Sequence, residues 1–280
     1  MLGIQANLKH LTEYQSDRYK GLPVQCSPSQ PEYKEILDCS YRELTRILAR
    51  YSRVILIRFD LAPGNTASSL SPPKHHTSIS MSPFLTSVRR KLERKYQTKM
   101  AYVWVKEYGN DDYNTGAHWH LWVALKKHND HKPPRLAEAV KKLILSSWEQ
   151  QAGINDRNRS SSYFYLDRTR MSPEVRAQDQ ESIRIDDLSV LIKREALQNR
   201  VANKNMVLGG VIDEAFYAIS YLAKAYTKLR VESGKGERTY NCSNIGLKDI
   251  NKQGRDAQIS ENLANIEEWL DVPLEPVDML

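Results

Sequence analysis

Hydrophobic positions recur along this chain with the two-residue period of strands and the longer period of helices, and their order predicts a mixed fold. Residues 54–61 (VILIRFDL) form a run of branched apolar side chains that predicts a buried strand. Residues 101–107 and 117–125 alternate between apolar and polar positions on either side of a turn-like segment, which indicates a β-hairpin. Residues 161–166 (SSYFYL) are a further strand candidate.

Helical spacing falls before, between and after these strands. We expect helices over residues 39–51, from Ser82 to about residue 95, over residues 135–151, and from Asp213 to about residue 227. From residue 54 to residue 166 the order is therefore β-α-β-β-α-β, the split β-α-β pattern of ferredoxin-like antiparallel sheets. The predicted fold class is α+β and ferredoxin-like.

Changes in polarity along the chain suggest the domain limits. Residues 1–38 are polar and contain three prolines, so we expect an irregular N-terminal arm before a domain at 39–247. Within that domain, residues 167–212 are mixed and charged and are interpreted as an insertion. Residues 248–280 are expected to form a polar and then acidic C-terminal tail, which either binds a partner or covers part of the basic body.

Charge is distributed unevenly over the 280 residues. The whole chain carries a net charge of +7, but its last twenty residues contain six acids and no Lys or Arg, so residues 1–260 carry +13. A basic body of this kind suits a polyanion such as nucleic acid, although charge alone is also compatible with a generic basic protein.

Cysteine usage and hydropathy exclude several classes of protein. Cys26, Cys39 and Cys242 are far apart in the sequence and odd in number, so neither a disulfide framework nor a zinc knuckle is expected. No stretch approaches the ~20 apolar residues that span a bilayer, and the N-terminus lacks the apolar core of a signal peptide. We expect a cytoplasmic protein with no membrane partner.

Candidate chemistry is concentrated in the second hairpin strand. His118 and His120 flank Trp119, so the two imidazoles share one face while Trp119, Leu121 and Val123 share the other, which can pack into the core. Two neighbouring imidazoles can bind one divalent metal ion. The alternative interpretation is that this histidine pair only decorates a surface.

Glu107 ends the first hairpin strand and offers a third ligand. In the antiparallel register that places Glu107 opposite His118, Val105 lies opposite His120, and the carboxylate shares the face of both histidines. A Glu/His/His set with open positions suits Mg²⁺ or Mn²⁺ used in phosphate chemistry. A structural zinc site would need about four ligands, usually including Cys.

The last predicted helix carries three tyrosines. At about 100° per residue, Tyr217, Tyr221, Lys224 and Lys228 fall in one sector, whereas Tyr226 falls on the apolar side. An ammonium group beside a phenol favours the phenolate, so Tyr221, three residues before Lys224, is the nucleophile candidate and Tyr217 the runner-up. The alternative is that these tyrosines simply occupy a half-exposed helix face.

Other residues are candidates for contacts with nucleic acid. The basic run RRKLERKYQTK contains Arg89, Arg90 and Lys91, which could contact phosphates without reading sequence or could form a solvated helix face. Arg58 and Lys228 are further, weaker candidates.

Two more groups of side chains complete the candidates. Trp104 and Trp122 in the hairpin could stack on bases. Arg58 and Asp60 alternate with Phe59, so one face of the first strand is polar and close to the expected metal side.

Together these motifs resemble the HUH endonucleases. The stretch AHWHLWVAL at 117–125 is similar to their histidine–hydrophobic–histidine strand, and SYLAK at 220–224 is similar to their YxxK tyrosine motif. The chain resembles the inovirus-type rolling-circle replication proteins and their relatives in phage satellites and prophages. Three further stretches agree with this resemblance, which spans roughly residues 20–247: IRFDL, WVKEYG and RTYNCSN.

The resemblance implies a divalent cation, usually Mg²⁺ or Mn²⁺, bound by His118, His120 and Glu107. It also implies that Tyr221, with Lys224 as its companion lysine, attacks DNA by transesterification. The tyrosine becomes linked to a 5′-phosphate, and the 3′-hydroxyl that is freed primes synthesis.

The function we expect is nicking and joining of single-stranded origin or hairpin DNA to start rolling-circle replication of a phage, satellite or plasmid-like element, with a host helicase as a candidate partner. Some replication initiators carry a second tyrosine one turn after the first, but here Ala225 occupies that position and Tyr226 follows it. A transposase or relaxase with the same chemistry, a non-catalytic nucleic-acid-binding module and a metal hydrolase that uses water remain alternatives.

Overall fold

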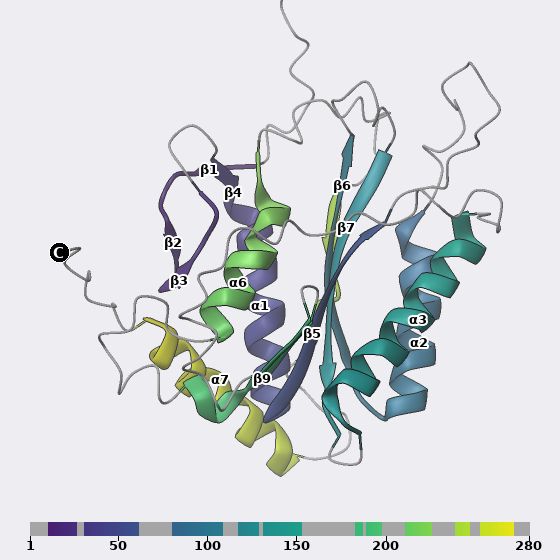
Figure 1. Cartoon of the computed structure of the whole chain (residues 1–280). Helices are drawn as coiled ribbons and strands as arrows, with labels where there is room; N and C mark the ends of the chain where they lie inside the picture. Colours follow the sequence, from purple (N-terminus) through teal and green to yellow (C-terminus); the bar gives the residue numbers. More distant parts are fainter. Residues whose placement is uncertain are drawn as a thin grey trace, which may run out of the picture.

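The structure, a computed structural model, has a six-stranded antiparallel sheet at its centre (Figure 1). Strand order is β10-β6-β7-β5-β9-β8, and all neighbouring strands are antiparallel. These strands are β5 (Arg53–Leu61), β6 (Met100–Tyr108), β7 (Ala117–Lys126), β8 (Ile183–Asp186), β9 (Ser189–Lys193) and β10 (Tyr240–Cys242). The residues described are 11–26, 31–61, 80–108, 117–128, 131–152, 183–186, 189–197, 211–225, 239–246 and 253–271.

Helices cover both faces of the sheet (Figure 1). Two of them, α2 (Met81–Tyr96) and α3 (Pro133–Ala152), lie on one face. The opposite face is covered by α1 (Lys34–Arg50) and α6 (Val211–Ser220), and α7 (Gln253–Asp271) packs against α1. Each side of the sheet therefore has its own hydrophobic core, as expected when alternating side chains of a strand are buried on both faces.

The connections form two interleaved crossovers. The chain leaves β5, passes through α2 and returns in β6, with β7 lying between these two strands. After β7 and α3 it reaches β9, which lies on the other side of β5. The predicted α+β class with an antiparallel sheet is confirmed, as are the two hairpin strands and the helices on either side of them.

Alternation along β7 gives the two faces that the sequence predicts. Trp119, Leu121 and Val123 belong to the core under α2 and α3, whereas Trp122 and Ala124 belong to the core under α1 and α6. The histidines have the parity of Trp122 and therefore face the α6 side.

The fourth strand of the predicted pattern is not where we expected it. The candidate at 161–166 lies outside the described residues. The position next to β5 is taken by β9, which pairs Ile55 with Leu191 and lies within the segment 167–212 that was interpreted as an insertion. The short β9 sequence SVLIK carries a weak periodic signal, so pattern alone did not identify it.

The N-terminal segment is not an irregular arm where it is described. It contains the short strands β1 (Glu13–Tyr14), β2 (Arg18–Tyr19), β3 (Leu22–Pro23) and β4 (Glu32–Tyr33), and α1 begins at Lys34. Tyr19, Leu22 and Val24 are buried in the core under α1 and α6. At Gly21, where φ is +74°, an added Cβ would lie 1.7 Å from the Leu270 carbonyl oxygen, so a close approach to α7 requires glycine here.

The described part of the C-terminal segment is also structured. Ile259, Ile266 and Leu270 of α7 are buried against α1. Each such side chain contributes about 1.5–3 kcal/mol through burial. Residues 253–271 therefore cover part of the body rather than forming a free tail.

Candidate active site

Glu107, His118 and His120 meet at the loop end of the β6–β7 hairpin, where β6 finishes and β7 begins. Glu107 pairs with His118 and Val105 pairs with His120, so the register that the sequence predicted is confirmed. One ligand atom from each of the three residues lies within 4.8 Å of the other two. Glu107 Oε2 is 3.2 Å from His120 Nε2 and 3.7 Å from His118 Nε2. Three converging donor atoms of this kind form a potential site for a divalent cation.

The three side chains differ in exposure. Those of Glu107 and His120 are 2% and 6% exposed, whereas that of His118 is 20% exposed and is the most open of the group. Burial by itself lowers the pKa of His120, but the carboxylates of Glu107 and Asp60 outweigh this effect and raise it above its usual value. The surroundings of His120 therefore favour a positive charge, which a proton or a metal ion can supply.

Asp60, on β5, contacts His120 through the other ring nitrogen. Its Oδ1 atom is 2.5 Å from His120 Nδ1, and its two carboxylate oxygens are 3.3 and 3.4 Å from Arg58 Nη2. Burial raises the pKa of Asp60, but Arg58 and His120 outweigh burial and lower it to about 2. A carboxylate on Nδ1 fixes the tautomer that presents Nε2 to a metal. The alternation of IRFDL predicted Asp60 on a polar strand face close to the metal side, but it did not indicate the contact with His120.

The tyrosine segment departs from the continuous helix that we predicted. α6 ends before Tyr221–Ala223, which form the 3₁₀ turn η4, and Lys224 is extended, with φ −51° and ψ 121°. Lys224 forms an isolated antiparallel bridge with Glu32, and the Ala225 N–H donates to the Pro31 carbonyl at 2.9 Å. The prediction that the helix continues past Lys224 is wrong, because the segment around β4 provides backbone partners outside the helix.

Tyr221 nevertheless lies beside the metal-ligand group. Its ring packs edge-on against the His120 imidazole, with 5.1 Å between ring centroids and an interplanar angle of 83°. Lys224 Nζ is 3.9 Å from the ring centroid and Arg58 Cζ is 4.4 Å from it. Tyr221 is half-buried, whereas Lys224 and Arg58 are buried. Two cations and a histidine therefore surround the ring, and a phosphate bound beside it would meet positive charge.

Arg58 lies on the polar face of β5, close to the metal-ligand group, where the alternation of the strand predicted it. It is 3% exposed, and its Nη1 donates to the Ala218 carbonyl at 3.2 Å. It links β5 to α6 beside Tyr221 and belongs to the site rather than to an exposed surface.

The remaining tyrosine-segment residues are placed as follows. Tyr217 is half-buried one turn before Tyr221, and its carbonyl accepts hydrogen bonds from Gln25 Nε2 and Ser220 Oγ, both at 2.9 Å. Lys228 and Tyr226 lie outside the described residues.

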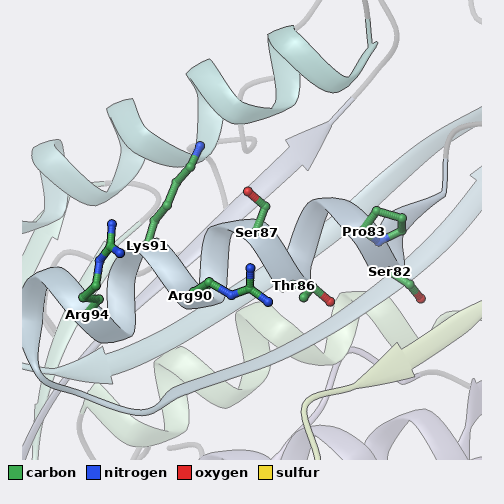
Figure 2. Close-up of a pocket in the computed structure, with 7 residues that line it drawn as sticks. All are labelled: Ser82, Pro83, Thr86, Ser87, Arg90, Lys91 and Arg94. Carbon is green, nitrogen blue, oxygen red and sulfur yellow. The ribbon is translucent and has the colours of Figure 1, made fainter.

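The predicted basic cluster lies on α2. Arg90 and Lys91 are exposed and Arg89 is half-buried. Figure 2 shows Arg90, Lys91 and Arg94 along an open groove of about 660 Å³, whose lining is completed by Ser82, Pro83, Thr86 and Ser87. Because α2 covers the sheet face opposite to the histidines, this surface is separate from the Glu107–His118–His120 group (Figure 1).

The two tryptophans that we considered for base stacking are buried. Trp104 is 5% exposed in the core under α2 and α3, and Trp122 is fully buried, with its Nε1 donating to Ser40 Oγ at 3.4 Å. That interpretation is wrong, because both sheet faces are covered by helices.

Comparisons with known proteins add no relative, since no protein-family profile, curated protein or solved structure matches the chain. Among the described residues, no helix combines the length and apolar character required to cross a membrane. Arguments about function therefore rest on the site itself.

Proposed function

We propose that the chain is a metal-dependent endonuclease of the HUH type, which nicks and rejoins single-stranded DNA with Tyr221 as nucleophile to start rolling-circle replication. One observation carries this proposal. The Tyr221 ring contacts His120, a member of the Glu/His/His group, across a sequence separation of about one hundred residues. A tyrosine beside a potential metal site is the arrangement that phosphotyrosyl transfer requires.

The donor set fits a divalent metal ion. Glu107, His118 and His120 supply one oxygen and two nitrogen donors, and Asp60 orients one of the imidazoles. One carboxylate and two histidines leave coordination positions open for substrate, which suits a catalytic ion such as Mg²⁺ or Mn²⁺. A bound cation would supply Lewis-acid polarisation of the phosphate that is attacked.

The covalent step is a transesterification. The Tyr221 hydroxyl oxygen forms a bond to a DNA phosphorus, and the bond from that phosphorus to the 3′-oxygen of the preceding nucleotide breaks. The phenol loses its proton and the departing 3′-oxygen gains one, so the products are a tyrosyl 5′-phosphodiester and a free 3′-hydroxyl. Lys224 and Arg58 place positive charge against the ring, which stabilises the negative charge of the phosphate under attack.

The topology supports the finer fold assignment. Numbered along the chain, β5, β6, β7 and β9 lie in the spatial order 2-3-1-4, with both crossover helices on one face. Two interleaved split β-α-β units of this kind are the ferredoxin-like pattern. We infer that this sheet is the scaffold that brings the ends of β5, β6 and β7 together at the site.

The charge distribution supports DNA as the substrate. Residues 1–260 carry a net charge of +13, and the α2 groove is lined by three cations and three hydroxyl groups. Side chains of these types contact phosphates without reading bases. The α2 surface is suited to hold a flanking part of the DNA, because it lies on the other side of the sheet from Tyr221.

The experiment is a cleavage assay on single-stranded DNA fragments that tile the genetic element encoding the chain, with Mn²⁺ present. Because the tyrosine joins the 5′-phosphate, a 3′-labelled strand should move into a protein-sized band on a denaturing gel. A 5′-labelled strand should give a shorter fragment that a polymerase extends. Tyr221→Phe should abolish both products, while the matched control Tyr217→Phe should retain them.

Two controls separate the alternative functions. A chelator, or His118→Ala combined with His120→Ala, should abolish cleavage without unfolding the protein. Cleavage with no protein-linked strand would identify a hydrolase that uses water. DNA binding with no cleavage of any fragment would identify a non-catalytic binding module, and an adduct mapped to Tyr217 would overturn the assignment of the nucleophile.

A further inference from the structure

Cys39 on α1 and Cys242 on β10 lie against the same guanidinium group. Arg42 Nη2 is 2.8 Å from Cys242 Sγ and 3.7 Å from Cys39 Sγ, so one nitrogen atom contacts both sulfurs. Both cysteines are partly exposed and neither forms a disulfide. This pair could not be predicted from the sequence, because its members lie near opposite ends of the chain.

The chain around Cys242 is fixed to α1 by several hydrogen bonds. Glu43 Oε2 accepts hydrogen bonds from the Ser243 hydroxyl and, at 2.9 Å, from the Ile245 N–H. Arg46 Nη1 donates to Asn244 Oδ1 at 3.2 Å. These contacts fix the backbone around Cys242 against α1, so the proximity of the two sulfurs results from the packing of β10 on α1.

Charge makes the two thiols unequal. The hydrogen bond from Cys39 and the charge of Arg42 lower the pKa of Cys242 to about 7, against the opposing effects of burial and Glu43. The hydrogen bond to Cys242 and burial raise the pKa of Cys39. Among the described residues, the titratable and charged groups that act on Cys242 are Cys39, Arg42 and Glu43 from α1, Tyr102 from β6 and Tyr240 from β10. A guanidinium between two sulfurs also opposes binding of a metal cation.

We propose that Cys39 and Cys242 form a dithiol redox site, in which Cys242 reacts with a peroxide and Cys39 then closes a reversible disulfide between α1 and β10. The proposal is independent of the nuclease assignment. It assigns a modification site to a part of the molecule that the nuclease site does not use. Cys242 pairs with Val103, which lies four residues before Glu107 on β6.

The chemistry balances with a peroxide as the oxidant. The Cys242 thiolate attacks one peroxide oxygen, the O–O bond breaks, and a sulfenic acid and water form after protonation. The Cys39 sulfur then attacks the sulfenic sulfur, and the S–O bond breaks with release of a second water. Two thiols lose two electrons and two protons in total, and a dithiol reductant reverses the change by thiol–disulfide exchange.

Cys26 is a built-in control for reactivity. Its Sγ donates to the Tyr14 carbonyl at 3.1 Å, and burial and the nearby Glu32 raise its pKa. At pH 7 a thiol of pKa about 7 should be alkylated about threefold faster than one of pKa about 8.5, because a larger thiolate fraction outweighs its lower nucleophilicity. Cys242 should exceed Cys26 by more than this factor, since the pKa of Cys26 is raised rather than ordinary.

The test uses the full reduced chain in the presence of a chelator, exposed to hydrogen peroxide and then to an alkylating reagent. Peptide mapping without reduction should show one crosslink, between the Cys39 and Cys242 peptides, with Cys26 alkylated. In Cys39→Ser, a sulfenic-acid probe such as dimedone should label Cys242. Cys26→Ser should form the crosslink at the wild-type rate, and Arg42→Gln should slow alkylation of Cys242 more than Arg42→Lys does.

Three results would each overturn the proposal. The first is a fully oxidised wild-type chain with no Cys39–Cys242 crosslink. The second is alkylation of Cys26 as fast as that of Cys242. The third is sulfenic acid that forms on Cys39 as readily as on Cys242. Mapping the wild-type protein keeps the proposal falsifiable even if a cysteine variant fails to fold.

Discussion

Asp60→Asn tests the carboxylate that lies behind His120. The substitution keeps the size of the side chain and one oxygen acceptor, but it removes the charge that lies 2.5 Å from His120 Nδ1 and 3.3 Å from Arg58 Nη2. Loss of an outer-shell partner of a metal-binding histidine typically weakens metal binding about 10–100-fold. We therefore expect the Kd for Mn²⁺ to rise by about that factor, which corresponds to roughly 1.4–2.7 kcal/mol.

The variant should also change the pH dependence of metal binding. Asp60 and Glu107 raise the pKa of His120, and a metal must displace the proton there, so affinity should increase with pH until the pH exceeds that raised pKa. Removing one of the two carboxylates lowers the pKa of His120. The pH range over which the Mn²⁺ affinity rises should therefore move to lower pH, while the maximal affinity falls. A general disruption of the site would lower the affinity without moving this pH range.

Stability at acid pH provides a second readout of the same substitution. Because the pKa of Asp60 is lowered from 3.8 to about 2, ionised Asp60 stabilises the fold above pH about 4, and this contribution is lost as the pH falls towards 2. The shift corresponds to a contribution on the order of 2 kcal/mol. Asp60→Asn should lack this part of the acid-induced loss of stability.

Calorimetric titration with Mn²⁺ at several pH values, together with urea unfolding, measures both effects. Asp38→Asn is the matched control, because Asp38 lies on α1 and accepts a hydrogen bond from the Tyr19 hydroxyl. A folded Asp60→Asn protein with unchanged Mn²⁺ affinity that rises over an unchanged pH range would refute the role assigned to Asp60.

The remaining predictions concern a ligand, a surface and a core. Glu107→Ala should reduce nicking more than Glu107→Gln, which keeps an oxygen donor, and extra Mn²⁺ should partly restore the Gln variant. If both variants and the wild type depend on metal concentration equally, Glu107 is not a metal ligand. Replacing Arg90, Lys91 and Arg94 with Ala should weaken binding to many single strands alike and reduce the salt slope by about 2 in fluorescence titrations, whereas loss for one sequence alone would indicate base reading. Ile266→Ala should lower the free energy of unfolding by about 2–5 kcal/mol in urea, while a change below ~0.5 kcal/mol would mean that α7 does not pack stably on α1.

The hairpin shows how much a local pattern can predict. Alternation fixed which side chains of β7 share a face, and pairing Glu107 with His118 then brought the three metal-ligand candidates together. A one-residue slip would have moved the histidines into the core beneath α2 and α3, which their polarity opposes. Register and site were therefore predictable from one segment, because both depend on neighbours in the hairpin.

Elements that depend on distant partners were not predictable in this way. β9 is short and becomes a strand through its pairing with β5, and α7 is held by apolar contacts with α1 although its residues are mostly polar. The N-terminal segment looked irregular because its strands are two residues long, yet Tyr19 and Leu22 are buried in the core. In each case the stabilising contact is made by residues far away in the sequence.

The tyrosine segment shows the same limit inside the site itself. Helical phase predicted that Tyr221 and Lys224 lie on one polar stripe, but the helix ends at this point. Lys224 is buried, and its backbone forms a β-bridge with Glu32. Tyr221 and Lys224 still meet, because the turn folds the ammonium over the ring at 3.9 Å. What separates Tyr221 from Tyr217 is therefore not exposure on a stripe but its contact with His120, which depends on the position of the η4 turn beside β7. The case for Tyr221 as nucleophile accordingly rests on tertiary structure, and variants that shift the end of α6 should affect it as strongly as variants of the lysine.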